Sequence, residues 1–284
     1  MSHLQEVTPC SLLPVSRPAL RLCARHRRLR MTRSPGLRRR SSRSNRTSRS
    51  PRYTYIATGE VLRGLRREGF EPFFVCQTRV RNVSRREFTR HMIRLRHADQ
   101  INGSEANEII LLNSHDGSSS YQMLAGMFRF VCQNGMVCGE TVGEVRVPHK
   151  GDVVGQVIEG AFEVLDGFGT VAEQRESMEA LRLESGEQAA FARAALALKY
   201  DNDDSPAPIT EAQLLTARRF DDRGADLWRT FNRVQENMTK GGLPGRNRNG
   251  RRTTTRPVGG IDQNVKLNRA LWVLAEEMRR RRAA

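Results

Sequence analysis

The sequence lacks the features of several protein classes. Its apolar runs are short, as in Ile109–Leu112, and none approaches the ~18 residues that span a bilayer. The first residues lack the apolar core and the cleavage site of a secretory signal. The five cysteines form no C-x-x-C pair, so we expect reduced thiols rather than a disulfide framework or a zinc ribbon. These absences predict a cytoplasmic protein without a membrane partner.

Recognisable enzyme motifs are missing as well. The sequence holds no G-x-S-x-G, no H-E-x-x-H, no G-x-G-x-x-G after a strand and no familiar pair of carboxylates. Aromatic residues make up only 6% of the chain, which argues against an extensive surface for stacking on bases. The sequence therefore predicts no cofactor and no metal site, and it favours a non-enzymatic protein while leaving catalysis open.

Positive charge is what the chain has in excess, and most of it lies in one segment. The 284 residues carry 48 Lys and Arg against 31 Asp and Glu, a net charge of +17. Residues 1–52 hold fourteen Arg and a single acid, Glu6, so this segment alone carries +13. The remaining 232 residues carry only +4, which is ordinary for a globular protein.

The Arg- and Ser-rich segment 1–52 cannot bury apolar surface, and it is predicted to be a disordered arm. It has three interpretations. It is an arm that binds nucleic acid, or it resembles an organellar transit peptide, which is also rich in Arg and Ser. The third is that an upstream start or a shifted reading frame added it to the chain, an interpretation that the abrupt change of composition at Tyr53 supports.

The rest of the chain predicts an α+β fold with an antiparallel sheet. Residues 53–150 form the first subdomain, with one helix capped by Thr58 and ended by Gly69. Alternating or short apolar runs predict strands, and a helical spacing follows the turn cluster at 113–117. The expected elements are a helix at 59–68, strands at 73–81, 87–97 and 108–112, a helix from Ser119 or Ser120 to Val131, and a long strand or hairpin over 136–149.

Residues 151–284 predict a mostly helical subdomain that packs with the first as one domain. Three capping boxes, with the pattern of Thr or Ser followed three residues later by Glu or Gln, begin at Thr170, Ser185 and Thr210. A linker is expected over 201–208. Apolar stripes at helical spacing predict two amphipathic helices, one over 224–239 and one through Leu267 and Met278.

The first candidate site is a row of arginines on the paired strands 73–81 and 87–97. Side chains on one face of a strand recur about every 6.6 Å, a spacing that can follow a phosphate backbone. The competing interpretation is a solvated sheet face paired with acids, which the frequency of Arg on half-exposed sheets favours. The candidate nucleic-acid-binding residues here are Arg79, Arg81, Arg90, Arg94 and Arg96.

The second candidate is the segment 240–256, which has six basic residues and no acid. Its glycines let backbone N–H groups approach phosphates, and its arginines add charge-assisted hydrogen bonds. It is no Walker A loop, because the G-x-x-x-x-G-K-[ST] pattern is absent. The alternative is a flexible connector that is merely basic. The candidate residues are Lys240, Arg246, Arg248, Arg251, Arg252 and Arg256.

Two further groups of polar residues are weaker candidates. His115 fits a general base and Asp116 a metal ligand in the 113–117 turn, although an Asx-type turn explains the same residues without function. His91 and His97 lie on an apolar strand face and are expected in the core. A polar helix seam either reads base edges or, more commonly, links helices. The seam consists of Asn232, Gln235, Glu236, Asn237, Asn264, Asn268 and Arg269.

Four strings of residues resemble one bacterial family. They are FTRHMIRLRH at 88–97, LLNSHDGSSSYQMLAGMFRFVCQNG at 111–135, LWRTFNRVQEN at 227–237 and VKLNRALW at 265–272. Together they resemble the phage- and plasmid-like proteins of "domain of unknown function 932" over about residues 53–284. The resemblance implies a cytoplasmic accessory protein of a plasmid, prophage or integrative element, and it carries no catalytic residues. Residues 1–52 depart from the family's usual beginning.

Three functional hypotheses follow. The first is non-enzymatic binding of single-stranded or distorted DNA through the sheet arginines and segment 240–256. The second is a metal-dependent enzyme acting on nucleic acid through His115 and Asp116. The third is a protein-interaction factor that acts on host functions and docks an acidic partner on the basic segment. The sequence leaves the oligomeric state open.

Overall fold

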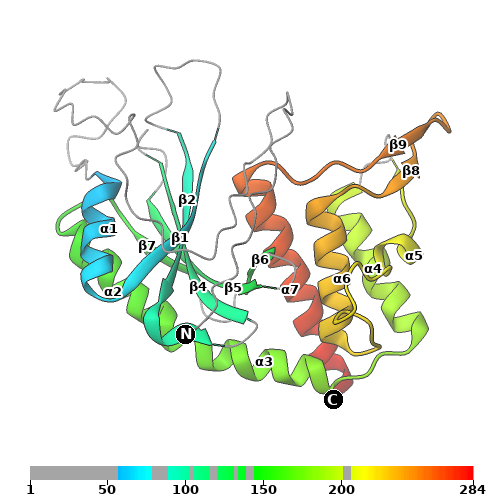
Figure 1. Cartoon of the computed structure of the whole chain (residues 1–284), viewed down its shortest axis with the longest axis horizontal. Coiled ribbons are helices and arrows are strands. Elements are labelled where there is room, and N and C mark those ends of the chain that lie inside the picture. Colours follow the sequence, from blue (N-terminus) through cyan, green and yellow to red (C-terminus); the bar gives the residue numbers. More distant parts are fainter. Residues whose placement is uncertain are drawn as a thin grey trace, which may run out of the picture.

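The computed structural model describes residues 57–78, 89–102, 105–114, 120–130, 134–138, 144–200 and 206–283. An antiparallel sheet with two helices forms one half of the described chain, and a group of helices forms the other (Figure 1). This is the α+β architecture expected from the sequence, with a helical C-terminal half. The arm 1–52 lies outside the described residues. The subdomain boundary at residue 150 remains a prediction.

Within the described residues the sheet has seven strands, in the path β1-β2-β4-β5-β6 with β3 paired to β4 and β7 paired to β5. All strand pairs are antiparallel. The strands are β1 (Phe70–Gln77), β2 (His91–His97), β3 (Ile101–Asn102), β4 (Glu105–Asn113), β5 (Tyr121–Arg129), β6 (Asn134–Val137) and β7 (Glu144–Val147). The predicted strands at 73–81, 87–97 and 108–112 correspond to β1, β2 and β4, although β1 begins earlier.

Two helices cover one face of the sheet. They are α1 (Thr58–Arg67), which packs on β1, and α2 (Val153–Asp166), which packs on β5 and β7. Thr58 does not cap α1 as predicted: the N-cap is Ala57, and the Thr58 hydroxyl is bonded to His91 Nε2 at 3.1 Å. Gly69 follows the end of α1 with a positive φ of 87°, a conformation that favours glycine.

The C-terminal helices pack beside the sheet around buried aromatic rings. They are α3 (Phe168–Ala180), α4 (Ser185–Tyr200), α5 (Glu211–Leu214), α6 (Leu227–Lys240) and α7 (Ile261–Ala283). Trp228 stacks on Phe231, and both rings contact Trp272 edge to face. One core cluster continues from the α1 and α2 side of the sheet into these helices. A smaller cluster lies on the opposite sheet face, where Ile261 and Val265 of α7 cover it.

The predicted helix through 119–131 is wrong, because Tyr121–Arg129 is the central strand β5. Both faces of β5 are buried, so apolar residues occupy nearly every position and give no alternation. Tyr121 and Met123 belong to one core cluster and Leu124 to the other. The predicted strand or hairpin over 136–149 is also corrected: β6 and β7 each pair with β5 instead of with each other.

The capping boxes had mixed outcomes. Thr210 and Gln213 form a complete capping box, but the helix it opens, α5, has only four residues. Thr170 lies inside α3, which starts at Phe168, so the predicted box there is wrong. At α4 the backbone N–H of Glu184 donates to Glu187 instead. In the described part of the chain no helix is long and apolar enough to cross a membrane.

Candidate nucleic-acid interface

The sheet arginines Arg94 and Arg96 lie inside the protein. Their exposed fractions are 5% and 4%, and the carboxylate of Glu108 is between them at 2.8 Å from Arg94 Nη1 and 2.7 Å from Arg96 Nη2. The Arg96 guanidinium also lies 4.2 Å from the centre of the Phe73 ring and 4.6 Å from that of Phe128. Alternation correctly placed both arginines on one face, but that face is packed and not open to a phosphate backbone.

Arg90, the remaining candidate that the structure describes, does not extend an open row. Arg90 pairs with Asp262 of α7 at 2.9 Å and donates to Gln122 at 2.8 Å. Arg79 and Arg81 lie outside the described residues. The predicted sheet interface is therefore corrected for Arg90, Arg94 and Arg96, because ion pairs and the N-terminal turn of α7 occupy the face on which it depended.

The 113–117 turn gives no structural support for a metal site. His115 and Asp116 lie outside the described residues. The adjoining Asn113 and Ser114 are buried, and the Asn113 side chain accepts from His149 Nε2 at 3.0 Å. Within the part of the chain that the structure describes, no group of three or more His, Cys, Asp or Glu side chains is arranged to hold a metal ion.

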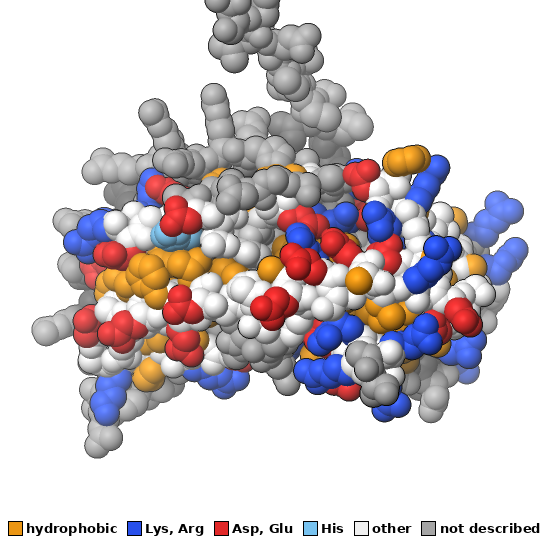
Figure 2. Space-filling model, turned by 90° about the horizontal axis from the view of Figure 1, so that it is seen from below, with side chains coloured by type: hydrophobic (Ala, Val, Ile, Leu, Met, Phe, Trp, Pro, Cys, Tyr) orange, Lys and Arg blue, Asp and Glu red, His pale blue; other side chains and the backbone are white. Residues whose placement is uncertain are grey.

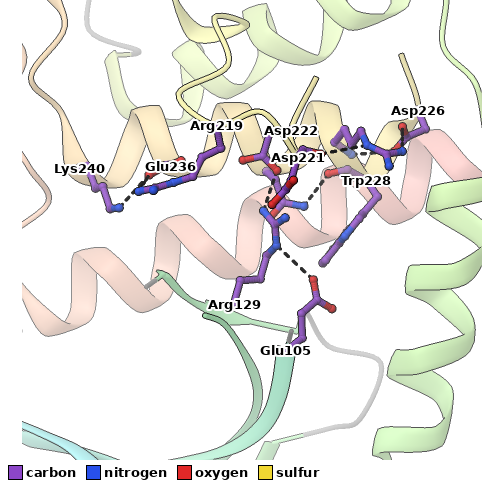
Figure 3. Close-up of polar contacts among 11 residues, drawn as sticks. Glu105, Arg129, Arg219, Asp221, Asp222, Asp226, Trp228, Glu236 and Lys240 are labelled. Carbon is purple, nitrogen blue, oxygen red and sulfur yellow. Dashed lines mark hydrogen bonds and ion pairs between the residues drawn. The ribbon is translucent and has the colours of Figure 1, made fainter. Parts of the chain in front are cut away.

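Ion pairs connect the sheet to the helical half (Figure 3). Arg129 on β5 donates to Glu105 on β4 at 3.1 Å and to Asp222, in the segment between α5 and α6, at 2.9 Å. Nearby, the buried carboxylate of Glu236 on α6 binds Arg219 at 3.1 Å and Lys240 at 2.8 Å. These two cations hold the pKa of Glu236 below its usual value, against the opposing effect of burial.

The polar helix seam also links structural elements. Gln235 of α6 donates to Asn268 of α7 at 2.7 Å, and Asn237 donates to the backbone carbonyl of Leu214 at 2.7 Å. All three side chains are buried. Their hydrogen-bonding groups are thus directed at the protein's own helices and loops.

Segment 240–256 contains a β-hairpin that sequence patterns did not predict. It is formed by β8 (Pro244–Arg246) and β9 (Arg252–Thr254), and it extends outward from the helical half (Figure 1). The inner face consists of Gly245 and Thr253. A Cβ atom on Gly245 would lie only 2.1 Å from the Pro208 carbonyl oxygen, so the hairpin packs closely against the body there. We call residues 244–256 the basic hairpin.

The outer face of the basic hairpin carries opposed arginines. Arg246 and Arg252 are direct cross-strand partners, and both side chains are exposed. In an antiparallel pair, directly opposed side chains lie on the same face with Cβ atoms about 5 Å apart. Since the Gly245 and Thr253 face packs against the protein, the Arg246 and Arg252 face is directed to solvent.

The turn of the basic hairpin is internally bonded. The side-chain oxygen of Asn247 accepts from the backbone N–H groups of Asn249 and Arg251, both at 3.0 Å. Gly250 has a φ of +71° and donates to the Asn247 carbonyl, and Arg246 Nη1 donates to the Gly250 carbonyl at 2.8 Å. Arginines 248 and 251 are therefore presented by an ordered turn.

The family model described as "Domain of unknown function (DUF932)" matches residues 46–272, most of the chain, including the sheet and the basic hairpin. The chain belongs to the DUF932 family. It is 62% identical over 231 residues to the "UPF0380 protein YfjQ" and 61% identical over 231 residues to the "UPF0380 protein YafZ", both of Escherichia coli strain K12. Each alignment covers 81% of this chain and 84% of the relative. No solved structure matches the chain.

In this DUF932 chain, most arginines outside the basic hairpin that the structure describes form ion pairs with carboxylates. The arginines at 246, 251, 252 and 256 form none with any described residue, although all four are exposed. Lys240 differs from them, because it binds Glu236. Figure 2 shows several Lys and Arg side chains projecting from the right-hand end of the molecule, which is the helical half.

The sequence patterns did not identify the acidic residues that pair with arginines of this DUF932 protein and so keep those arginines from binding a ligand. Glu108 precedes the apolar run Ile109–Leu112 and lies opposite Arg96 once β2 and β4 are in register. The sequence offered one indication of this ion pair: Glu108 is an acid in a strand next to that of Arg96, on the same sheet face. Asp222 is 93 residues from its partner Arg129, a distance along the chain that no local pattern bridges.

Proposed function

We propose that the protein binds nucleic acid without catalysis, through the basic hairpin. The observation that supports this proposal is that four exposed arginines without an ion pair to any described residue lie together on one short hairpin, whereas most other described arginines are ion-paired. Arginine is well suited to phosphate, because its planar guanidinium donates two parallel hydrogen bonds. The proposed contact residues are Arg246, Arg248, Arg251, Arg252 and Arg256.

The hairpin geometry favours an anionic ligand. Like charges that lie directly opposite each other in an antiparallel pair are destabilising. Arg246 and Arg252 have this relationship on the outer face, and segment 240–256 contains no acid to offset it. A bound phosphate group between the two guanidiniums relieves the repulsion, and the ordered turn at Asn247 lowers the entropy cost of presenting further arginines.

Phosphate contacts give affinity with little sequence preference and a steep dependence on salt. Segment 240–256 has no aromatic residue, so the basic hairpin by itself binds backbone and not bases. We propose single-stranded or distorted DNA as the preferred form. A cytoplasmic location and an accessory role on a bacterial mobile element belong to the same proposal, and their support is the family resemblance.

Binding of fluorescently labelled oligonucleotides tests this proposal. The hairpin variant replaces Arg246, Arg251, Arg252 and Arg256 with Gln in the full chain. The charge-matched control replaces Arg67, Arg182, Lys266 and Arg281 with Gln; these four cations are exposed and form no ion pair with any described residue. The hairpin variant should lose affinity and the control should retain it. Equal affinity of both variants would contradict the proposal, as would an acidic protein partner that binds the hairpin while oligonucleotides do not.

A further inference from the structure

Phe220 projects into solvent from the segment between α5 and α6. Its exposed fraction is 78%, the highest of the large hydrophobic side chains in the described parts of the chain; the next is Val75 at 50%. Exposing an aromatic ring forfeits the stabilisation that burial would provide. The ring is therefore accessible to a ligand outside the fold.

The segment around Phe220 is held in place on both sides. Before it, Arg218 donates to the Asn237 side chain and to the Gly241 carbonyl, and Arg219 binds Glu236 at 3.1 Å. After it, Asp222 binds Arg129 at 2.9 Å. The Arg223 N–H donates to the Phe220 carbonyl at 3.0 Å, which closes a turn. We call residues 218–223 the aromatic turn. Its anchors fix the ring outside the core.

A cation lies beside the ring. The Arg223 guanidinium lies 5.4 Å from the ring centre, within the range of a cation–π contact. Three residues of the aromatic turn have exposed charges, and two of them, Arg218 and Arg223, are cationic; the third is Asp221. The other large exposed hydrophobic side chains of the described structure, Val75, Phe162, Leu198 and Val273, belong to other elements.

The composition of the aromatic turn favours a nucleic-acid base over a protein as the ligand that contacts Phe220. Protein-docking surfaces are contiguous apolar patches, whereas Phe220 is a single exposed ring with the Arg223 guanidinium beside it. A single aromatic ring beside guanidinium groups is the arrangement that stacks on an unpaired base while its phosphates are neutralised. The aromatic turn is also tied to the hairpin side of the molecule, because Arg218 contacts Gly241, three residues before β8.

We propose that Phe220 stacks on an unpaired base of the single-stranded nucleic acid whose phosphates the basic hairpin binds. This inference rests on the proposed function. It explains why the protein would prefer single-stranded to double-stranded nucleic acid. A paired base inside a duplex has both faces covered by its neighbours, so Phe220 contributes to single-strand binding and not to duplex binding.

Two substitutions of the exposed ring test the inference in the full chain. Phe220→Trp places a fluorophore at the site, and the chain's two own tryptophans are buried, at 4% and 0% exposure. Titration with a single-stranded oligonucleotide should quench the new exposed emission, and a duplex of the same length should not. Phe220→Ala should weaken single-strand binding by about 5- to 100-fold and leave duplex binding unchanged. Leu198→Ala, which removes an exposed apolar side chain from α4, is the matched control.

The outcomes separate this inference from the proposed function. If Phe220→Ala leaves single-strand affinity unchanged while the hairpin variant lowers it, stacking is wrong and hairpin binding stands. If the hairpin variant also keeps full affinity, or if the native protein binds neither form, both proposals fail. If Phe220→Ala instead abolishes self-association measured by light scattering and leaves oligonucleotide binding intact, the ring is a protein contact and the inference is overturned.

Discussion

Arg96 and Glu108 form an ion pair inside the sheet, with 2.7 Å between Arg96 Nη2 and Glu108 Oε1. The same carboxylate binds Arg94 at 2.8 Å, so one acid pairs with two buried cations. Aromatic rings enclose Arg96 from the other side. A shift of β2 against β4 would separate these charges and leave them buried without a partner, which costs free energy. The ion pairs therefore help to fix the register of the two strands.

Replacement of Glu108 with Gln should therefore be severely destabilising. The amide keeps the size of the side chain but removes the charge that offsets Arg94 and Arg96, and we expect a loss of about 3–5 kcal/mol in the free energy of unfolding. Urea denaturation measures this loss in the free energy of unfolding. Glu60→Gln is the control, because the Glu60 pair with Arg63 is 3.9 Å long and exposed, and its loss should cost less than about 0.5 kcal/mol. Equal effects of the two substitutions would show that the buried pair does not stabilise the sheet.

Gly135 is the second sensitive position of this arrangement. A Cβ atom there would lie 2.2 Å from Arg94 Nη1, so Gly135→Ala should displace the guanidinium and destabilise the protein by about 1–3 kcal/mol. Gly169, near the start of α3, has nothing within 4 Å of the same added atom. Gly169→Ala should raise stability by about 0.5–1 kcal/mol, since alanine is the better helix former. Thermal unfolding of both variants compares the two effects, and a stable Gly135→Ala variant would contradict the packing of Arg94.

His91 should make the stability depend on pH. Burial lowers the pKa of His91 from 6.5, while its ring is bonded to Thr58. The unfolded chain therefore binds a proton that the folded chain does not, and the free energy of unfolding falls as the pH drops through about 6.5. His91→Gln should flatten this fall between about pH 7 and pH 5, measured by urea denaturation at each pH. An unchanged pH profile would show that His91 is not the group responsible.

Two buried cysteines should resist alkylation in the folded protein. Burial raises the pKa of the Cys76 thiol to about 11 and raises that of Cys138 as well, and both are free thiols. The thiolate is the reactive form, so iodoacetamide at pH 8 should leave both unmodified until urea is added. Peptide mass spectrometry measures the labelling of each position. Rapid labelling of Cys138 in the native protein would mean that β6 opens readily.

Periodic patterns predicted the elements in which apolar residues recur on one face and polar residues on the other. The stripe through Leu227 and Phe231 marked α6, and alternation in 87–97 marked β2 and put Arg94 and Arg96 on a common face. Patterns failed where both faces are mostly apolar, as in β5, because such a run fits helix and strand equally well.

Exposure was harder to predict than secondary structure, because it depends on distant partners. Arg94 and Arg96 both pair with Glu108, and rings of β1 and β5 cover Arg96, whereas Arg246 and Arg252 have no described carboxylate partner. Their local sequences do not distinguish these two outcomes. The hairpin itself escaped prediction because each strand has only three residues, too few for an alternation to be seen.

The most direct test of the basic hairpin is the salt dependence of single-strand binding. The affinity of the native chain, the four-arginine hairpin variant and the charge-matched control is measured from low to physiological salt. Each neutralised phosphate contributes about 0.7 to the slope of log K against log salt for a single strand. If the hairpin binds the backbone, its variant should lower the slope by up to about 3 while the control keeps the native slope. If both variants give the native slope, or lower it equally, the hairpin is not the phosphate-binding surface.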